Sequence, residues 1–335
     1  MNALYKLATE VARPSIYQIR NHKLYRNENC FFPARCQGVE HFFLEIINEL
    51  PDMDFVVNVR DWPQSPSKWG NKPKMPVFSF SKQPSFHHDI MYPAWTFWEG
   101  GPAVWPLYPT GLGRWDKMKS ELLKEGKKYP WSKKEDVFFF RGSRTSDERD
   151  PLVKLSRARP DLGDASYTKN QAYKGAKDTL FAEPAKEIHL RDHCKYKYLF
   201  NFRGVAASFR HKHLFVCNSL VFHVGSSKIK DDWLEFYYSA MQPWVHYVPV
   251  DTDASQLTSL NNVKYLISYF KRNERKALKI AQRGFDFIDQ NLGMEEIRCY
   301  WKNALLGYQK LVKFDITEKP DPSYKQITKQ RKDEL

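Results

Sequence analysis

The sequence predicts an α/β fold divided into two domains. Residues 55–59 and 137–140 are short apolar runs, as expected for strands that are buried on both faces of a sheet. Upstream of the first run, residues 39–50 place their apolar side chains at helical spacing, so a helix precedes the strand. The chain has 335 residues, which is enough for two domains that each bury a core.

Composition and charge narrow the class of protein. Hydrophobic residues make up 42% and aromatic residues 15% of the chain, which indicates a globular protein. The net charge of +14 favours an anionic partner: nucleic acid, a membrane surface or a phosphorylated ligand. We expect no nucleic acid, because no such motif or single basic stripe is present. We also expect no membrane span, since no apolar run is long enough.

The last four residues, Lys332-Asp333-Glu334-Leu335, match the signal that a receptor reads to retrieve proteins to the endoplasmic reticulum. We therefore expect a protein of the endoplasmic-reticulum lumen. That compartment is oxidising, so the five cysteines should pair. A lumenal protein needs a signal sequence and the chain opens without one, so we expect that an N-terminal part is missing.

Arg60 and Asp61 follow the first buried strand directly. Open α/β sheets bind their ligands at the carboxyl ends of the strands, and a carboxylate there can act as a general base. The alternative is that the two residues form a local ion pair that only caps the strand.

The first half of the chain predicts the following elements in order. Residues 1–29 are polar and partly helical, and Cys30 and Cys36 bracket a loop that suits a local disulfide. Residues 77–81 alternate as a strand does. Residues 86–116 are rich in aromatic residues, glycine and proline, so they form loops. Such aromatic side chains either stack on sugar rings and bases or pack the loops themselves. His87 and His88 would point to opposite faces of a strand, so we expect no metal there.

The second half begins with a lysine-rich helix at 117–128 and a linker at 131–134. The strand at 137–140 is followed by Gly142-Ser143-Arg144-Thr145-Ser146, a layout that presents backbone amides to a phosphate. Any strand-to-helix turn can contain these residue types, however. A strand at 194–200 is followed by small residues at a helix start and then by Arg210. This arginine can bind a diphosphate; the alternative is a surface arginine beside a closely packed helix. Two turns that suit a phosphate in one domain favour a nucleotide as the ligand.

Asp251 and Asp253 match the D-x-D with which metal-dependent glycosyltransferases hold a metal and nucleotide. Capping of a helix from Gln256 by Asp253 and Ser255 explains the pattern equally well. Further helices are expected at 277–292 and 295–312. The tail from residue 318 is charged and should be mobile.

Four stretches resemble the CAP10-type protein O-glucosyltransferases: residues 60–63, 92–115, 140–146 and 195–210. The likeness runs from about Leu24 to the C-terminus. It implies a GT-B fold, two Rossmann-like domains that face a substrate cleft. The domains would be residues 1–133 on the acceptor side and 134–292 on the donor side, with a helix at 293–317 and a tail at 318–335.

The resemblance also implies the reaction. The donor would be UDP-glucose, with UDP-xylose as a second donor and no metal cofactor. The acceptor would be the serine of C-x-S-x-(P/A)-C in a folded EGF-like repeat of Notch-type proteins. A serine hydroxyl is a poor nucleophile, so a carboxylate must take its proton, and one base suffices for inversion. Two rivals are a metal-dependent transferase that uses Asp251 and Asp253, and a non-catalytic chaperone or lectin for EGF repeats.

The family's functional residues carry over onto matching positions. Asp61 would be the catalytic base, with Arg60 beside the acceptor serine. Two loops would grip the EGF repeat: Phe31, Phe32, Pro33, Ala34 and Arg35, and Ala103, Val104, Trp105, Pro106, Leu107, Tyr108 and Pro109. The donor would be held by Tyr108, Ser143, Arg149, Val205, Ala206, Ala207, Ser208, Phe209 and Arg210. The family pairs Cys30 with Cys36 and Cys194 with Cys217. It pairs Cys299 with an N-terminal cysteine that is absent here.

Overall fold

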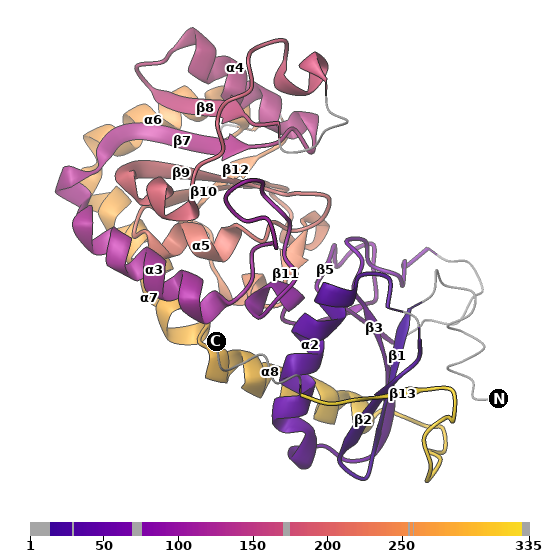
Figure 1. The fold of residues 1–335 in the computed structure, drawn as a ribbon. Coiled ribbons are helices and arrows are strands. Elements are labelled where there is room, and N and C mark those ends of the chain that lie inside the picture. The colour runs from indigo at the N-terminus through magenta and orange to yellow at the C-terminus, as the bar shows by residue number, and fades with distance from the viewer. Residues whose placement is uncertain are drawn as a thin grey trace. The chain divides into compact units, whose positions relative to one another are not determined.

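The computed structural model describes residues 14–28, 30–68, 76–169, 175–253, 255, 256 and 258–329 (Figure 1). Contacts divide the chain into two compact units. The first comprises Met1–Gly101, Leu234–Phe236 and Gly293–Leu335, and the second comprises Pro102–Trp233 and Tyr237–Leu292. This division differs from the boundary expected at residue 133. Residues 102–133 group with the second unit because Trp115 donates to the carbonyl of Leu292 at 2.5 Å and Lys119 to that of Asp289 at 2.7 Å.

The first unit contains a six-stranded sheet in the order β13-β2-β1-β3-β4-β6. Its strands are β1 (Ser15–Arg20), β2 (Lys23–Arg26), β3 (Met53–Asn58), β4 (Val77–Ser79), β6 (Ile90–Met91) and β13 (Lys325–Ile327). β1 runs antiparallel to β2 and β3, whereas β3, β4 and β6 are parallel.

Two expectations for this unit differ from the described structure. Residues 1–29 were expected to be partly helical, but the part of them that the structure describes forms the β1–β2 hairpin at residues 15–26. Asn21 and His22 take positive φ angles of 48° and 57° at its turn, as tight hairpins require. The tail expected to be mobile contributes β13, which pairs with β2. The retrieval signal at residues 332–335 lies outside the described residues.

The core of the first unit is aromatic. Helix α2 (Pro33–Ile46), which begins earlier than the periodicity predicted, and helix α8 (Met294–Gln309) pack together on it. The ring of Phe43 contacts Phe55 of β3 at 5.2 Å and Trp301 of α8 at 4.8 Å, between ring centroids. A small separate sheet joins β5 (Ser81–Lys82) to β11 (Leu234–Glu235), so the strand predicted at 77–81 is divided between two sheets.

The second unit contains a five-stranded parallel sheet in the order β12-β10-β9-β7-β8 (Figure 1). Its strands are β7 (Glu135–Gly142), β8 (Gly163–Tyr167), β9 (Tyr196–Phe202), β10 (Leu220–Gly225) and β12 (Val248–Asp251). Read from β8, the chain order is 2-1-3-4-5, a doubly wound arrangement. Phe138, Phe139 and Phe140 are all buried, which confirms the prediction of a strand buried on both faces.

The helices of this unit are α3 (Trp115–Lys128), α4 (Asp150–Ala158), α5 (His211–Val216), α6 (Val263–Arg272) and α7 (Glu274–Asn291). The helix expected from Gln256 begins only at Val263, after the 3-10 turn Leu260–Asn262. In the described part of the chain, no helix is both long and apolar enough to cross a membrane.

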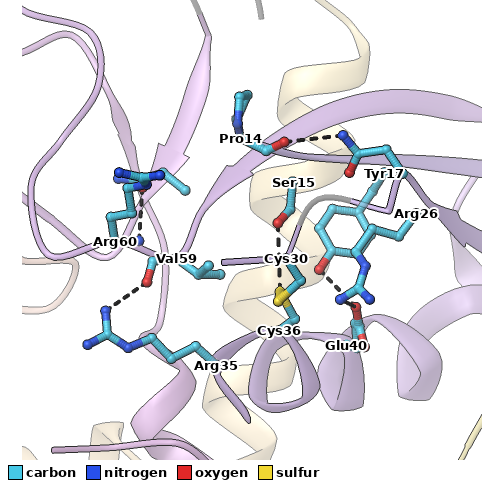
Figure 2. Close-up of a disulfide and its surroundings, with 12 residues drawn as sticks. Pro14, Ser15, Tyr17, Arg26, Cys30, Arg35, Cys36, Glu40, Val59 and Arg60 are labelled. Carbon is cyan, nitrogen blue, oxygen red and sulfur yellow. Dashed lines mark hydrogen bonds and ion pairs between the residues drawn. A yellow bond between two sulfur atoms is a disulfide. The ribbon is translucent and has the colours of Figure 1, made fainter. Parts of the chain in front are cut away.

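The structure contains both disulfides that the resemblance implied, Cys30–Cys36 and Cys194–Cys217. The first closes against the start of α2, where Pro33 occupies the first helical turn, and the Sγ of Cys36 lies 3.7 Å from the hydroxyl of Ser15 (Figure 2). Cys299 is exposed and is not bonded to any of the other four cysteines, all of which are described.

Candidate active site

The loop that follows β3 is anchored by the last residue of that strand. The side-chain oxygen of Asn58 accepts a hydrogen bond from the amide of Arg60 at 2.9 Å. Its side-chain nitrogen donates to the carbonyl of Trp62 at 2.7 Å and to the hydroxyl of Ser79 at 2.9 Å. Asn58 therefore fixes the backbone on both sides of Asp61.

The far end of the same loop is held by Asp89, whose side chain is fully buried. Its carboxylate accepts hydrogen bonds from the amides of Gln64 at 2.7 Å and Ser65 at 2.8 Å, and from the hydroxyl of Ser79 at 2.7 Å. The sequence patterns gave no role to Asn58 and Asp89. Asp89 bonds groups 10 to 25 residues away, and the bonds of Asn58 to Arg60 and Trp62 are those of an ordinary turn.

Asp61 lies between these anchors with 34% of its side chain exposed. Its Oδ1 accepts from Nη1 of Arg35 at 3.2 Å, and its Oδ2 has no hydrogen-bond partner among the described residues. The same nitrogen of Arg35 donates to the carbonyl of Val59 at 2.8 Å (Figure 2). One carboxylate oxygen is thus held while the other is free to accept a proton.

The local ion pair considered for Arg60 and Asp61 is absent from the described structure. The guanidinium of Arg60 instead lies over the ring of Phe31, 4.3 Å from its centroid. Phe31 is 58% exposed, so this pair presents an aromatic and cationic surface near Asp61. Arg35 also lies over aromatic rings, those of Phe32 at 4.1 Å and Trp95 at 4.5 Å.

The two loops predicted to grip an acceptor belong to different units. Residues 31–35 lead into α2 in the first unit. Residues 103–109 lie in the second unit, where Val104 and Tyr108 form a bridge that leaves Trp105 69% exposed. The Tyr108 hydroxyl accepts from the amide of Leu190 at 3.1 Å, and burial raises the pKa of Tyr108.

The second unit places Arg149 between the ends of β7 and β9. Its Nη1 donates to the carbonyl of Ser143 after β7, and its Nη2 to that of Arg203 after β9, each at 2.5 Å. In a sheet of this order, β7 and β9 border the switch point, where doubly wound folds bind their ligands. Burial, followed by the charge of Arg210, lowers the pKa of Arg149 to about 9.

Arg210 brings a second guanidinium to this place. A Cβ at Gly142 would lie 3.0 Å from its Nη2, so the glycine leaves room for the cation. Arg149 and Arg210 each lie 5.5 Å from the centroid of Phe140. The Arg210 side chain forms no hydrogen bond or ion pair within the described structure, and burial lowers its pKa. Two partly desolvated cations side by side favour an anionic ligand.

The residues before Arg210 form a turn instead of the expected helix start. α5 begins only at His211 and has six residues. The amide of Gly204 donates to the carbonyl of Ala206 at 2.9 Å, and that of His211 to Ser208 at 3.0 Å. Ala206 and Ala207 are buried, Val205 is 40% exposed, and Ser208 and Phe209 are half-buried. The helix start therefore lies nearer to Arg210 than predicted.

The two acidic residues of the D-x-D pattern serve a turn. Oδ1 of Asp251 accepts from the amide of Asp253 at 2.7 Å, and Oδ1 of Asp253 accepts from the amide and the hydroxyl of Ser255, each at 2.9 Å. Such bonds are typical of aspartate in turns. Within the described ranges, no three His, Cys, Asp or Glu side chains gather where they could hold a metal ion.

Comparisons with known proteins agree with the resemblance seen in the sequence. Protein O-glucosyltransferase 1 of Rattus norvegicus is 57% identical over 333 residues, which cover 98% of this chain and 81% of the relative. The Homo sapiens protein of that name is 58% identical over 317 residues (94% and 77%). O-glucosyltransferase rumi of Drosophila melanogaster is 54% identical over 319 residues (95% and 74%).

The match to a solved structure, the GtfA/B complex, covers 54% of this chain and 38% of the matched chain. Its TM-score is 0.36 and its sequence identity 11%, and these values are too low to support an argument about the fold. The profile described as glycosyl transferase family 90 matches residues 8–332. The resemblance to CAP10-type O-glucosyltransferases, and among them to Rumi, is confirmed. The chain belongs to glycosyl transferase family 90.

Proposed function

We propose that this glycosyltransferase moves glucose from UDP-glucose, with inversion, to the serine of C-x-S-x-(P/A)-C in folded EGF-like repeats of Notch-type proteins. Relatives that are 54–58% identical carry the name O-glucosyltransferase, which supports transfer of glucose to proteins. UDP-xylose is a second donor in this proposal, because it lacks one hydroxymethyl group and so changes few contacts.

The arrangement around Asp61 carries the proposal. Arg35 holds Oδ1, and the free Oδ2 accepts the proton of the acceptor serine as the serine oxygen attacks the anomeric carbon. A bond forms between that oxygen and the carbon, and the bond from the carbon to the diphosphate oxygen breaks. The electron pair leaves with UDP, so no second carboxylate is needed as a nucleophile. Arg60 and residues 31–35 and 103–109 would contact the EGF repeat.

The proposed binding site of the sugar donor, UDP-glucose, lies at the carboxyl ends of β7 and β9. Ser143, Arg149, Arg210, the turn at 205–209 and Tyr108 would hold UDP-glucose, with Arg210 on the diphosphate. Charge develops on the departing UDP, and preorganised guanidinium groups stabilise such charge. The proposal gives this task to the arginines, because the carboxylates of Asp251 and Asp253 already accept turn hydrogen bonds.

We also propose the GT-B architecture, in which two Rossmann-like domains face a substrate cleft. The parallel strands β3, β4 and β6 of the first unit and the doubly wound sheet of the second unit support it. The proposed compartment is the endoplasmic-reticulum lumen, with retrieval through residues 332–335. Two disulfides suit an oxidising compartment.

The test is mass spectrometry of a folded EGF repeat that contains C-x-S-x-P-C, incubated with the protein and either UDP-glucose or UDP-xylose. The proposal expects a hexose on the serine with UDP-glucose, a pentose with UDP-xylose, and transfer that persists in a chelator. An unmodified repeat with bound protein would support the non-catalytic alternative. Transfer abolished by chelator and restored by a divalent cation would contradict the assignment to arginines.

A further inference from the structure

Glu187 is a carboxylate for which the proposed reaction has no role. It lies in the second unit, two residues after Ala185, whose amide donates to the carbonyl of Tyr167 at 2.9 Å. Ala185 also bridges to Thr168, the residue that follows β8. Thr168 in turn donates its amide to the carbonyl of Gly142 at the end of β7, at 3.0 Å. These contacts place the segment of Glu187 at the carboxyl end of β8, beside the end of β7.

Two polar atoms at this place are buried without a partner. They are Oε1 of Glu187 and Oγ1 of Thr168, neither of which has a hydrogen bond within the described structure. Burial raises the pKa of Glu187, and the nearby Thr168 hydroxyl and the charges of Arg210 and Arg141 lower it in part. Glu187 is thus close enough to Arg210 to feel its charge. Thr168 has one proton to donate, whereas a carboxylate accepts several hydrogen bonds, so the buried Oε1 of Glu187 still lacks a donor and indicates a missing ligand group.

The charges of the surrounding side chains indicate the chemistry of the missing ligand group. Arg149 and Arg210 select an anion, but a phosphate placed against Glu187 would be repelled. A neutral group that donates hydrogen bonds, such as a hydroxyl, satisfies both the carboxylate and the threonine. In doubly wound folds that bind nucleotides, an acidic residue that follows the glycine-containing first turn binds the ribose hydroxyls. β7 is the first strand of this sheet and β8 the second, so Glu187 occupies the corresponding end.

We propose that Glu187 accepts hydrogen bonds from the ribose hydroxyls of the nucleoside diphosphate whose phosphates contact Arg210. This inference rests on the proposed donor site and adds a residue that selects a ribonucleotide over a deoxyribonucleotide. The hexose hydroxyls are the other neutral donors of the substrate, and the test separates them from the ribose.

The test is calorimetric titration of the full chain with UDP, 2′-deoxy-UDP and 3′-deoxy-UDP, none of which carries a hexose. Wild type should bind UDP at least roughly tenfold more tightly than one of the deoxy analogues, as expected for a hydrogen bond to a charged group. In Glu187→Ala this preference should fall to about twofold or less, while binding of that deoxy analogue changes little. Glu187→Gln, which keeps the shape, should retain part of the preference.

Glu183→Gln is the matched control, because Glu183 is exposed in the same segment and has no hydrogen bond within the described structure. It should bind all three nucleotides as wild type does. An equal loss of UDP and both analogues in Glu187→Ala would show that Glu187 acts through Arg210, and would overturn the inference. Unchanged discrimination in Glu187→Ala, or none in wild type, would also overturn it. Failure of wild type to bind UDP at all would overturn the proposed donor site itself.

Discussion

Arg35 and Asp61 meet at the carboxyl end of β3, with Nη1 of Arg35 3.2 Å from Oδ1 of Asp61. The two residues are 26 positions apart in sequence. The same guanidinium holds the carbonyl of Val59 and lies over the rings of Phe32 and Trp95. One cation therefore fixes the backbone before the carboxylate and one oxygen of the carboxylate itself.

Replacement of Arg35 should reduce transfer without affecting the donor. Arg35→Lys keeps the charge but loses the planar fork and the stacking on aromatic rings. We expect transfer to an EGF repeat to fall about tenfold, because Asp61 loses its orientation. UDP binding should stay unchanged. Rate measurements beside calorimetry check this, with Arg275→Lys, an exposed arginine, as the control. A loss of UDP binding equal to the loss of rate would contradict it.

Asp89 should stabilise the fold and also support transfer. Asp89→Asn turns one of the two acceptor oxygens into a donor that faces the amide of Gln64 or Ser65. We expect the free energy of unfolding in urea to fall by about 2 kcal/mol, as for a buried hydrogen bond to a charged group. Transfer should fall more than the folded fraction does, because the loop of Asp61 is loosened.

The control for Asp89→Asn is Asp315→Asn, which removes an exposed carboxylate that has no hydrogen bond within the described structure. It should change neither the free energy of unfolding nor the rate of transfer. Wild-type stability in Asp89→Asn would show that the network around Asp89 contributes little.

The strands that border the candidate site were predictable because a strand buried on both faces is apolar throughout. Residues 55–59 and 137–140 predicted β3 and β7, and the residues directly after them supplied Asp61 and Ser143. The resemblance then gave these residues roles that their local pattern alone could not.

The contacts that hold the site were not predictable from local patterns. Arg35 reaches Asp61 from another element, and Asp89 bonds amides 24 and 25 residues away. The hairpin at residues 15–26 was missed because β1 is buried along its whole length yet carries Ser15, Gln18 and Arg20, so its sequence is neither apolar throughout nor alternating. The turn before α5 was taken for a helix start, since small residues suit both.

Lys134 should make stability depend on pH above neutrality. Its side-chain nitrogen is buried and donates to the carbonyls of Cys194 at 2.5 Å and Cys217 at 2.9 Å. Burial lowers the pKa of Lys134 from 10.5 to about 7. Between these values the unfolded chain binds one more proton than the folded chain, so a rise in pH favours the folded state. The stability contributed by Lys134 is complete above 10.5 and is lost as the pH falls to about 7.

The measurement compares urea unfolding of wild type and Lys134→Met between pH 7 and 9.5. The difference in free energy of unfolding should increase with pH in favour of wild type, by at most about 1.4 kcal/mol per pH unit. Lys133→Met, at an exposed neighbour, should follow wild type. Parallel curves for wild type and Lys134→Met would contradict the lowered pKa.

The acceptor should be recognised in its folded form. Exposed groups at Phe31 and Trp105 form part of the loops assigned to the EGF repeat. A preorganised repeat spares the ordering cost of a flexible chain, so a reduced linear peptide with the same C-x-S-x-P-C sequence should be modified at least about tenfold more slowly. The rates of modification of both acceptors are measured by mass spectrometry. Equal rates would show that these loops recognise the amino-acid sequence of the acceptor and not its folded shape.

The central claim, that Asp61 is the catalytic base, is tested most directly by Asp61→Asn with transfer and UDP binding measured on the same preparation. The amide keeps the size of the side chain but cannot take the serine proton, so transfer should fall by about a hundredfold or more while UDP binds normally. Arg210→Ala provides the contrast, because the loss of the cation assigned to the diphosphate should weaken UDP binding and transfer together. An Asp61→Asn protein that glucosylates a folded EGF repeat at nearly the wild-type rate would contradict the account.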